Sequence, residues 1–438
     1  MKLKKIVAAL AIAGVAVPAF ATNGYFSHGF GIKAKGMAGV GIALPQDTLA
    51  AATNPAGMVM VGDRMDFGID WFKPVRGADI SGSNSPGPTL NIDGSYNGNG
   101  DSSFLIPEFG YNKMLGWDMS VGVSVYGNGG MNTRYNSSPF AAGGLGAGAT
   151  GVPGQNPGGV NLEQLFVAPT FAMKVTKNNA LGVSLVFAQQ RFGATGLQAF
   201  TGFSPAGRIS VSPNDVTDRG NDTTNGWGVR VGWTGQVTDS VSLGATYASK
   251  IKGKFEAYKG LFAGGGEFDI PENYGIGIAL KATPQLTVAA DVQQINYSKS
   301  KSIGNPIDCF FAGKCQLGAD NGPGFGWRDV TVFKLGVSYD LSNDLTLRGG
   351  LSTNRQPIPE SQTFFNILAP GVVENHLTLG ATWTLANKNE LTVGYMHAFK
   401  KTVNGSNSFG APGGFGPGAV SLHMYEDSLG IAYGIKYQ

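Results

Sequence analysis

Few residues of this chain are suited to catalytic chemistry. The sequence holds four histidines, His28, His376, His397 and His423, and no Gly-x-Ser-x-Gly motif that would present a nucleophilic serine. Hydrolysis by a serine needs a histidine beside it as general base, and no nucleophile pairs with any of the four. The sequence therefore predicts a protein that is not an enzyme and needs no cofactor. A lipolytic membrane enzyme is the alternative that these residues disfavour.

The two cysteines, Cys309 and Cys315, are separated by five residues. A metal site is the alternative to a disulfide, but no further Cys or His nearby would complete its ligand set. Two cysteines so close in an exported chain pair within one loop. We expect a disulfide between them and no bound metal.

Residues 1–21 have the three parts of a secretory signal peptide. Three lysines lie within residues 2–5, residues 6–17 are apolar, and an A-x-A cleavage motif occupies 19–21. The apolar run is shorter than the roughly 20 residues of a transmembrane helix, and no later segment reaches that length. The sequence predicts an exported chain that begins at Thr22, with an uncleaved anchor as the alternative.

The composition is typical of a membrane β-barrel. Glycine makes up 68 of 438 residues, well above the usual ~7%, while charged residues are 14% and aromatic residues 11%. Such a barrel meets lipid on its outer wall and needs small side chains inside. The net charge of +3 is small and spread along the chain, so nothing indicates a nucleic-acid partner.

The chain shows repeated alternation of period two. At 65–71 the odd positions are Met, Phe, Ile and Trp, and the positions between them are Asp, Gly and Asp. Apolar residues that face lipid and small or polar residues that face a lumen produce this pattern. Fourteen such runs begin near Arg64, Ser102, Asp118, Asn161, Asn179, Asn225, Val241, Asn273, Leu286, Arg328, Leu345, Val372, Asn389 and Ser421.

The connections between these runs alternate in length. Short turns such as Lys177-Asn178-Asn179 and Ser342-Asn343-Asp344 alternate with long segments rich in Gly, Pro, Ser and Asn. Outer-membrane barrels have short turns on the periplasmic side and long loops outside. The sequence predicts an all-β fold, a 14-stranded antiparallel transmembrane barrel over residues 63–438. A soluble sandwich is disfavoured because the second face of the strands is small rather than polar.

Residues 22–62 precede the first strand and lack its alternation. They are rich in Gly and Ala, Asp47 is placed to cap a short helix over 48–53, and Asn54-Pro55 would end that helix. A wall lined with small residues leaves a lumen to be filled, and this segment is available on the periplasmic side. We expect it to be an N-terminal hatch that plugs the barrel, with Asn54-Pro55-Ala56 as the turn into the first strand.

Several charged residues fall on the inward face by alternation. A charge beside low-dielectric protein needs a partner. We expect these residues to pair within the wall or with two hatch lysines; the set is Asp66, Asp70, Arg230, Asp291, Arg348, Lys33 and Lys35.

Motifs along the chain resemble the FadL family of outer-membrane transporters for long-chain fatty acids, which includes toluene-uptake relatives. The resemblance rests on the hatch motif Asn54-Pro55-Ala56, on Ile106-Pro107-Glu108, on Gly127-Asn128-Gly129-Gly130, on Ile270-Pro271-Glu272 and on Pro357-Ile358-Pro359. It covers essentially the whole mature chain.

The resemblance implies passive uptake of a hydrophobic molecule. The ligand would be caught by outer loops, move inside the barrel and leave sideways through a gap at a kinked third strand. Glycines weaken a strand ladder, so Gly127, Asn128, Gly129 and Gly130 are the expected kink. The alternative is that these glycines only begin the next loop. Outer-membrane lipid and lipopolysaccharide are the expected surroundings, and a monomer is the expected state.

The resemblance also implies two basic residues that contact the ligand, because Arg191 and Arg328 match the positions of such residues in the family. Arginine is the side chain best suited to hold the carboxylate of a fatty acid. Alternation puts Arg328 on the inward face with Lys334, but puts Arg191 in the lipid-facing register of 181–187. The alternative for each is an arginine at the rim, solvated or bound to lipopolysaccharide phosphate.

Two other transport functions stay open at this stage. Uptake of aromatic hydrocarbons would use the same architecture. A general diffusion porin would narrow its lumen with an inward loop, and has no need of a 40-residue segment before the first strand. We expect fatty-acid uptake because Arg191 and Arg328 favour an acid.

Overall fold

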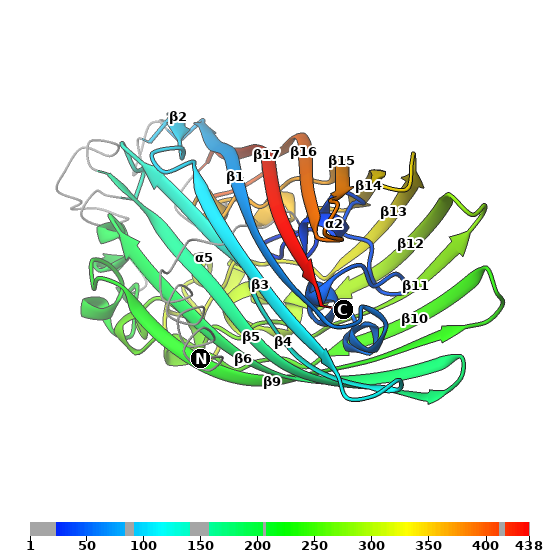
Figure 1. Ribbon diagram of the computed structural model, residues 1–438. Helices are drawn as coiled ribbons and strands as arrows, with labels where there is room; N and C mark the ends of the chain where they lie inside the picture. Colours follow the sequence, from blue (N-terminus) through cyan, green and yellow to red (C-terminus); the bar gives the residue numbers. More distant parts are fainter. Residues whose placement is uncertain (1–22, 84–91, 141–156, 205–206, 411–416, 438) are drawn as a thin grey trace.

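A closed antiparallel β-barrel of 14 strands forms the wall (Figure 1). The computed structural model describes residues 23–83, 92–140, 157–204, 207–410 and 417–437, so the predicted signal peptide lies outside them. The strands are β1 (Arg64–Ser81), β3 (Phe104–Met114), β4 (Met119–Tyr135), β5 (Gly158–Thr176), β6 (Asn179–Thr195), β9 (Asp222–Gln236), β10 (Val241–Ala248), β11 (Asn273–Lys281), β12 (Leu286–Ile295), β13 (Val330–Asp340), β14 (Leu345–Asn354), β15 (Asn375–Thr384), β16 (Glu390–Asn404) and β17 (Ala419–Lys436).

The barrel closes between its first and last strands. β1 pairs with β17 along its whole length, from Arg64 opposite Lys436 to Ser81 opposite Ala419. Each of the 14 predicted strand starts lies within three residues of the observed one. The predicted fold is confirmed, because the period-two pattern that lipid imposes on a barrel wall marks every strand.

Three short strands lie outside the wall. β2 (Gly94–Asn97) extends β1 on the side of the long loops, and β7 (Phe203–Ser204) pairs with β8 (Gly207–Arg208) within one loop. The helices are single turns; they are α2 (Ile32–Lys35), α3 (Ala263–Gly266), α4 (Lys301–Gly304), α5 (Asp308–Phe311) and the 3₁₀ turns η1 (Thr48–Ala52), η2 (Pro55–Met60), η3 (Gln198–Phe200), η4 (Pro213–Asp215), η5 (Glu256–Tyr258), η6 (Tyr297–Lys299), η7 (Glu360–Gln362) and η8 (Phe365–Ile367). Within the described ranges, no helix is long and apolar enough to cross a membrane.

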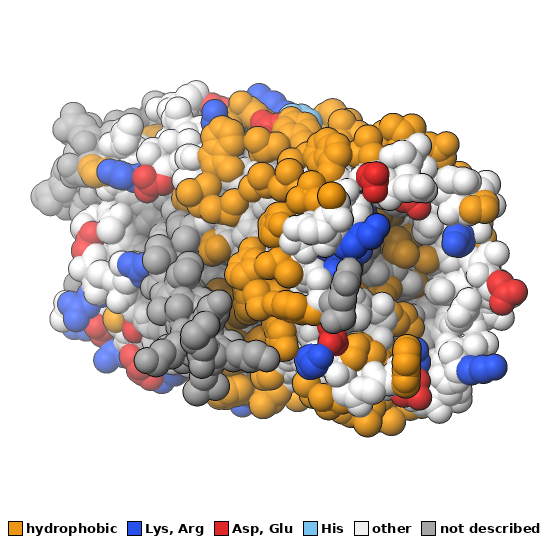
Figure 2. Space-filling view, in the orientation of Figure 1, with side chains coloured by type: hydrophobic (Ala, Val, Ile, Leu, Met, Phe, Trp, Pro, Cys, Tyr) orange, Lys and Arg blue, Asp and Glu red, His pale blue; other side chains and the backbone are white. Residues whose placement is uncertain are grey.

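The outer face of the wall is apolar. Figure 2 shows hydrophobic side chains gathered across the middle of the barrel, with most charged side chains toward its two ends. Large apolar residues at alternate positions make this band; they include Trp71, Leu185, Trp227, Leu379 and Leu429, each at least 40% exposed. A band of this kind is expected where strands face lipid.

The described part of the expected hatch, residues 23–62, lies inside the barrel (Figure 1), and this segment is called the hatch below. Asp47 caps η1 as expected, because its carboxylate accepts a hydrogen bond from the Leu49 N–H at 2.9 Å. The hatch then packs through η2 against β5, β6 and β9. Nearly all of its residues up to Val59 are buried.

Glycines in the wall let the hatch backbone approach closely. A Cβ atom on Gly182 of β6 would lie 2.3 Å from the backbone of Pro55 and Ala56. A Cβ atom on Gly232 of β9 would lie 1.9 Å from the side-chain oxygen of Asn54. The small inward residues of the sequence are therefore the surface on which the hatch rests.

We predict that Gly182→Ala destabilises the folded barrel by about 1–3 kcal/mol, because the new methyl group overlaps hatch backbone that cannot rotate away. The measurement is the temperature at which the purified barrel unfolds, followed by its shift in gel mobility. Gly349→Ala in β14 is the matched control, since the nearest atom to its Cβ is 3.8 Å away. Equal unfolding temperatures for the two variants would contradict the packing described.

Candidate functional site

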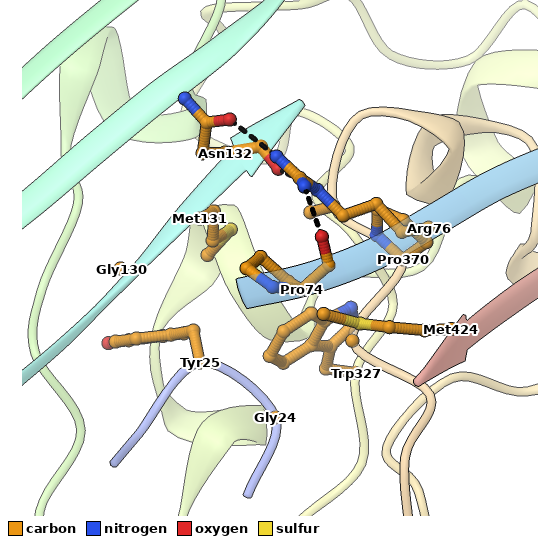
Figure 3. A pocket seen from close by; sticks show the side chains of 12 residues that line it. Gly24, Tyr25, Pro74, Arg76, Gly130, Met131, Asn132, Trp327, Pro370 and Met424 are labelled. Carbon is orange, nitrogen blue, oxygen red and sulfur yellow. Dashed lines mark hydrogen bonds between the residues drawn. The ribbon is translucent and has the colours of Figure 1, made fainter. Parts of the chain in front are cut away.

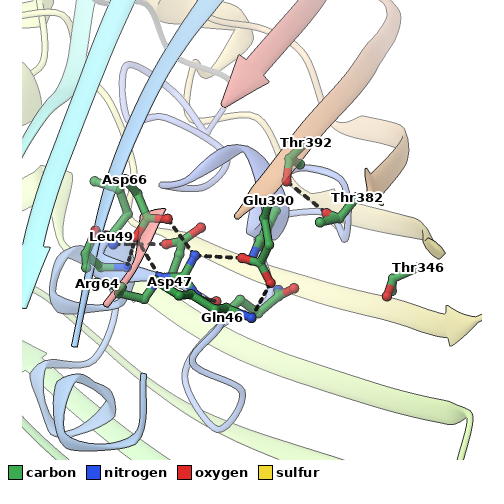
Figure 4. A network of polar contacts seen from close by, with 12 residues as sticks. Gln46, Asp47, Leu49, Arg64, Asp66, Thr346, Thr382, Glu390 and Thr392 are labelled. Atoms are coloured by element: carbon green, nitrogen blue, oxygen red, sulfur yellow. Dashed lines mark hydrogen bonds and ion pairs between the residues drawn. The ribbon is translucent and has the colours of Figure 1, made fainter. Parts of the chain in front are cut away.

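A buried ionic network fixes the hatch to the first and thirteenth barrel strands, β1 and β16 (Figure 4). Glu390 of β16 accepts from Lys33 of the hatch at 2.5 Å and from Arg64 of β1 at 2.8 Å. Arg64 also pairs with Asp66 at 2.6 Å, and Asp66 accepts from the Thr48 hydroxyl at 2.7 Å. Buried charges of both signs are thus paired, as they must be away from water.

Further wall carboxylates hold the hatch from other sides. Lys35 pairs with Asp70 at 2.6 Å, which confirms the expected pairing for Asp70. Glu108 accepts from the backbone N–H of Ile32 at 2.9 Å, and Asp291 accepts from that of Gly41 at 2.8 Å. These contacts tie residues 31–49 to four separate strands, β1, β3, β12 and β16. Arg230 and Arg348 form no ion pair with the described residues, so the expectation is wrong for these two; they donate to the Thr53 carbonyl and to the Gln46 side chain, respectively.

Asn54-Pro55-Ala56 begins a helical turn and is not the turn into β1. The Asn54 side chain caps η2 by accepting from the Ala56 N–H at 3.1 Å, and its amide donates to the Trp233 carbonyl of β9 at 2.9 Å. Proline at the first helical position explains the motif, because its missing N–H would have no partner there. β1 begins at Arg64, ten residues after Asn54 and beyond the end of η2.

The wall is interrupted between β3 and β4, its second and third strands. Pairing of β3 with β4 ends at Phe109 opposite Val125, so the β4 edge from Tyr126 onward has no β3 partner. In the same place the β4–β5 register shifts between Gly127 and Gly129. Asn128 is the extra residue of this bulge, so the kink predicted at residues 127–130 coincides with the interruption.

The beginning of the hatch occupies the free edge of β4. Phe26 forms a bridge with Gly129, the Gly130 N–H donates to the Tyr25 carbonyl at 3.0 Å, and the Ser27 N–H donates to the Asn128 carbonyl at 3.0 Å. A Cβ on Gly129 would lie 1.9 Å from the Tyr25 carbonyl, so only glycine permits this contact. Residues 25–27 thus replace β3 on this part of β4.

Loop aromatics cover this segment from the side of the long loops. Tyr25 packs against Tyr297 and Trp327, with ring centroids 5.3 and 6.0 Å apart. Burial raises the pKa of Tyr297, so its hydroxyl stays protonated and donates to the Asn23 carbonyl. The start of the hatch is held by a few aromatic and hydrogen-bonded contacts, unlike the ion-paired remainder.

A cavity of about 30 Å³ lies behind the interruption (Figure 3). Pro74 and Arg76 of β1, Met131 and Asn132 of β4, and Trp327 are among its lining residues. Arg76 is 1% exposed and reaches toward Asn132 across the gap left by β3 (Figure 3). Sequence reasoning missed Arg76, although it continues the inward register of Asp66 and Asp70 along β1.

Two more cavities adjoin the lumen. One of about 40 Å³ is apolar and lies among the long loops, lined by residues that include Phe200, Phe262, Phe325, Phe365 and Leu368. The other, of about 10 Å³, lies beside the bulge and is lined by Phe26, Asn128, Arg230 and others. Arg230 is 4% exposed, donates to the Thr53 carbonyl at 3.3 Å, and leaves its Nε without a hydrogen-bond partner.

The arginines expected from the sequence lie away from these cavities. Arg191 keeps the outward register of β6 and faces Glu163 at 3.8 Å, and Arg328 is exposed just before β13. Neither lines a cavity described here. Their role as carboxylate contacts stays a prediction, now confined to the rim.

The extracellular loops contain an aromatic cluster, and the predicted disulfide links two residues of the loop that carries part of it. Cys309 and Cys315 are bonded, and they flank Phe310 and Phe311. Phe200, Phe364 and Phe365 pack together with these rings and are buried. Two of the long Gly-rich segments between strands, at 141–156 and 411–416, lie outside the described residues.

Residues 11–437 match the model of a family described as outer membrane protein transport protein (OMPP1/FadL/TodX). The chain belongs to this family. Its localisation in the outer membrane and its role in transport of hydrophobic compounds follow from membership together with the barrel. The family and its solved structures are transport proteins rather than enzymes.

Solved structures of the OMPP1/FadL/TodX family share the fold. The P. putida toluene transporter TodX superposes with a TM-score of 0.66 at 16% identity, over 94% of this chain and 99% of that one. A Pseudomonas aeruginosa FadL homologue gives 0.68 at 16% identity, over 95% and 100%. The Ralstonia pickettii toluene transporter TbuX gives 0.62 at 18% identity, over 94% and 99%. No curated protein sequence matches this chain significantly.

We predict that Glu390→Gln loosens the hatch, because Lys33 loses its carboxylate partner and Arg64 keeps only Asp66. Removing one member of a buried ion pair costs about 3–5 kcal/mol. Single-channel current across a planar bilayer measures hatch opening, and brief openings are expected that the parent protein lacks.

The double variant Lys33→Met with Glu390→Gln is the control for this prediction. It removes the uncompensated lysine, so its openings are expected to be fewer than those of Glu390→Gln alone. Openings equally frequent in the single and double variants would show that the Lys33–Glu390 pair does not hold the hatch.

Proposed function

We propose that this transporter takes up long-chain fatty acids, captures them among the extracellular loops and releases them sideways into the membrane between β3 and β4. The observation that carries the proposal is the interrupted wall at Tyr126–Met131, with an internal cavity directly behind it. β3 and β4 remain paired from Phe109 opposite Val125 to Met114 opposite Ser120, so the interruption is confined to the part of β4 beyond Val125. An opening at one strand edge is where a ligand can enter lipid without crossing the hatch.

Physical chemistry favours a sideways exit for such a ligand. Each CH₂ group is less favourable in water than in an apolar environment by about 0.8 kcal/mol, so a long chain crosses an aqueous pore poorly. Phe200 and Phe365, which line the apolar loop cavity, belong to the same buried hydrophobic cluster as Tyr25 and Trp327 beside the interruption. The anchored part of the hatch would stay in place beneath this route.

The choice of an acid over an uncharged hydrocarbon rests on buried cations. Arg76 and Arg230 both line cavities, and their hydrogen bonds go to neutral oxygens. A guanidinium binds a carboxylate more strongly than a neutral oxygen because the bonds are charge-assisted. At the rim, Arg328 and Arg191 are proposed as first contacts for the acid head.

Uptake of aromatic hydrocarbons is the second candidate function. Two of the compared structures are named as toluene transporters, and the same loop cavity would accept a small ring. A general diffusion porin is disfavoured, since the hatch is held by buried ion pairs within the lumen. We also propose a monomer, because one chain supplies the wall, the hatch and the cavities, in contact with lipid and lipopolysaccharide.

We predict that deleting Asn128 slows fatty-acid uptake at least about tenfold while the barrel still folds, an effect equivalent to about 1.4 kcal/mol on the transport barrier. Asn128 is the extra residue between Gly127 opposite Leu165 and Gly129 opposite Gln164, so its loss leaves every other β4–β5 pair unchanged. The straightened β4 is expected to pair further along β3. The measurement is uptake of labelled oleic acid by cells carrying each variant.

Deletion of Lys400 is the matched control, because it removes a similar bulge from β16, where the register shifts between Ala398 and Lys401. That variant is expected to transport normally. Normal uptake after deletion of Asn128 would rule out the exit at β4. Rapid toluene uptake without fatty-acid uptake by the parent protein would favour the second candidate function.

A further inference from the structure

Arg76 spans the end of the wall interruption that lies nearer to the long loops. It lies on β1, but its guanidinium bonds to β4, the strand two positions away, through the Asn132 carbonyl at 2.8 Å and the Asn132 side-chain oxygen at 2.6 Å. Its Cζ also lies 5.9 Å from the ring centroid of Phe104, the first residue of β3. The Arg76 side chain thus connects β1 directly to β4, close to Phe104, where β3 begins.

Only neutral oxygens accept hydrogen bonds from this guanidinium. Besides Asn132, its partners are the Pro74 carbonyl at 3.0 Å, the Asp101 carbonyl at 2.7 Å and the Asn99 side-chain oxygen at 3.5 Å. The described residues place no carboxylate within ion-pair distance of Arg76, although it is 1% exposed. A buried cation without an anionic partner is costly.

Three buried cations near the hatch differ in this respect, whereas Arg230 and Lys334 also bond only to neutral oxygens. Arg64, Lys33 and Lys35 each pair with a carboxylate at 2.5–2.8 Å. The carboxylate of Asp101 pairs instead with Arg134, at 3.1 Å. Glu426 of β17 is also buried in this part of the barrel and lies close enough to interact electrostatically with Arg76, but no hydrogen bond or ion pair joins the two side chains. The hydrogen bonds that Arg76 donates therefore all go to neutral oxygens, which a ligand carboxylate could replace.

The geometry points to Arg76 as a latch of the lateral exit. By latch we mean a side-chain link between β1 and β4 that breaks when the carboxylate of an amphiphilic acid takes the place of Asn132 on the guanidinium. This inference rests on the proposed function and assigns a specificity-determining residue to it. A carboxylate in the adjoining cavity would replace the two Asn132 oxygens on the guanidinium, with two charge-assisted bonds in place of two neutral ones. That exchange removes the side-chain link between β1 and β4. An uncharged molecule of the same length offers no such exchange.

The position of the cavity supports the exchange. Arg76, Asn132, Gly130 and Met131 line it together, and Tyr25 of the hatch lines its other side (Figure 3). A head group bound to Arg76 would therefore lie beside the β4 edge that Tyr25 covers. Binding at the latch and displacement at that edge involve the same few residues.

The first test compares oleic acid with oleyl alcohol, which share one hydrocarbon chain. Affinities are measured with the purified, full-length protein in detergent. Arg76→Met is expected to weaken acid binding at least about tenfold and to leave alcohol binding unchanged. Arg134→Met, an exposed arginine on β4, is the control and is expected to keep the preference for the acid. An unchanged acid preference in Arg76→Met would overturn the latch.

A second variant tests the latch without altering Arg76. Asn132→Ala removes the side-chain oxygen that binds the guanidinium, so acid affinity is expected to rise. Spin labels on engineered cysteines at Lys73 and Asn136, both exposed, report the β1–β4 separation, since the described cysteines are already paired. Oleic acid should lengthen this distance in the parent protein, oleyl alcohol should not, and Asn132→Ala should be long without ligand.

The results of these tests distinguish a failure of the proposed function from a failure of the latch alone. A parent protein that binds neither oleic acid nor its alcohol would contradict the proposed function and, with it, the latch. A parent protein that binds and transports the acid, with a β1–β4 distance insensitive to it and to Asn132→Ala, would overturn the latch alone.

Discussion

The structure depends on how the backbone N–H and C=O groups of β4 form hydrogen bonds beyond the point where this strand parts from β3. Within a membrane, an unpaired backbone group costs several kcal/mol, so barrels close completely. β4 parts from β3 after Val125, and the hatch supplies replacement bonds at Gly130 and Asn128. The wall is therefore closed here by a segment that is not part of it. At this place in the wall, closure depends on a few contacts that can separate without breaking the barrel.

The division of the hatch follows from the same constraint. Its later part carries Lys33 and Lys35, whose buried ion pairs resist displacement because a lone buried charge is costly. Its first residues, 23–27, are held by hydrogen bonds and aromatic packing around Tyr25. Movement at the exit therefore need not open a channel through the barrel. A hydrophobic ligand and a sealed outer membrane are compatible in this arrangement.

Much of the fold could be predicted from sequence because lipid imposes period two on every strand, and glycine at alternate positions indicated a filled lumen. Alternation also placed Asp70 on the inward face, where it pairs with Lys35, one of the two candidate hatch lysines. Asn54-Pro55-Ala56 was misassigned because proline after a capping residue is compatible with a turn as well as a helix start. Arg76 was missed because its importance depends on where β3 begins, and that depends on pairing between distant strands rather than on local pattern.

The central claim is that a fatty acid leaves the barrel between β3 and β4. Cross-linking in cells with a photoreactive long-chain acid, followed by mass-spectrometric mapping, tests it most directly. The account predicts labels on both edges of the interruption, at Phe104–Glu108 and Tyr126–Met131. Labels concentrated instead on the periplasmic turns, such as Lys177–Asn179, and on the hatch near Val61 would show passage through the barrel and contradict the account.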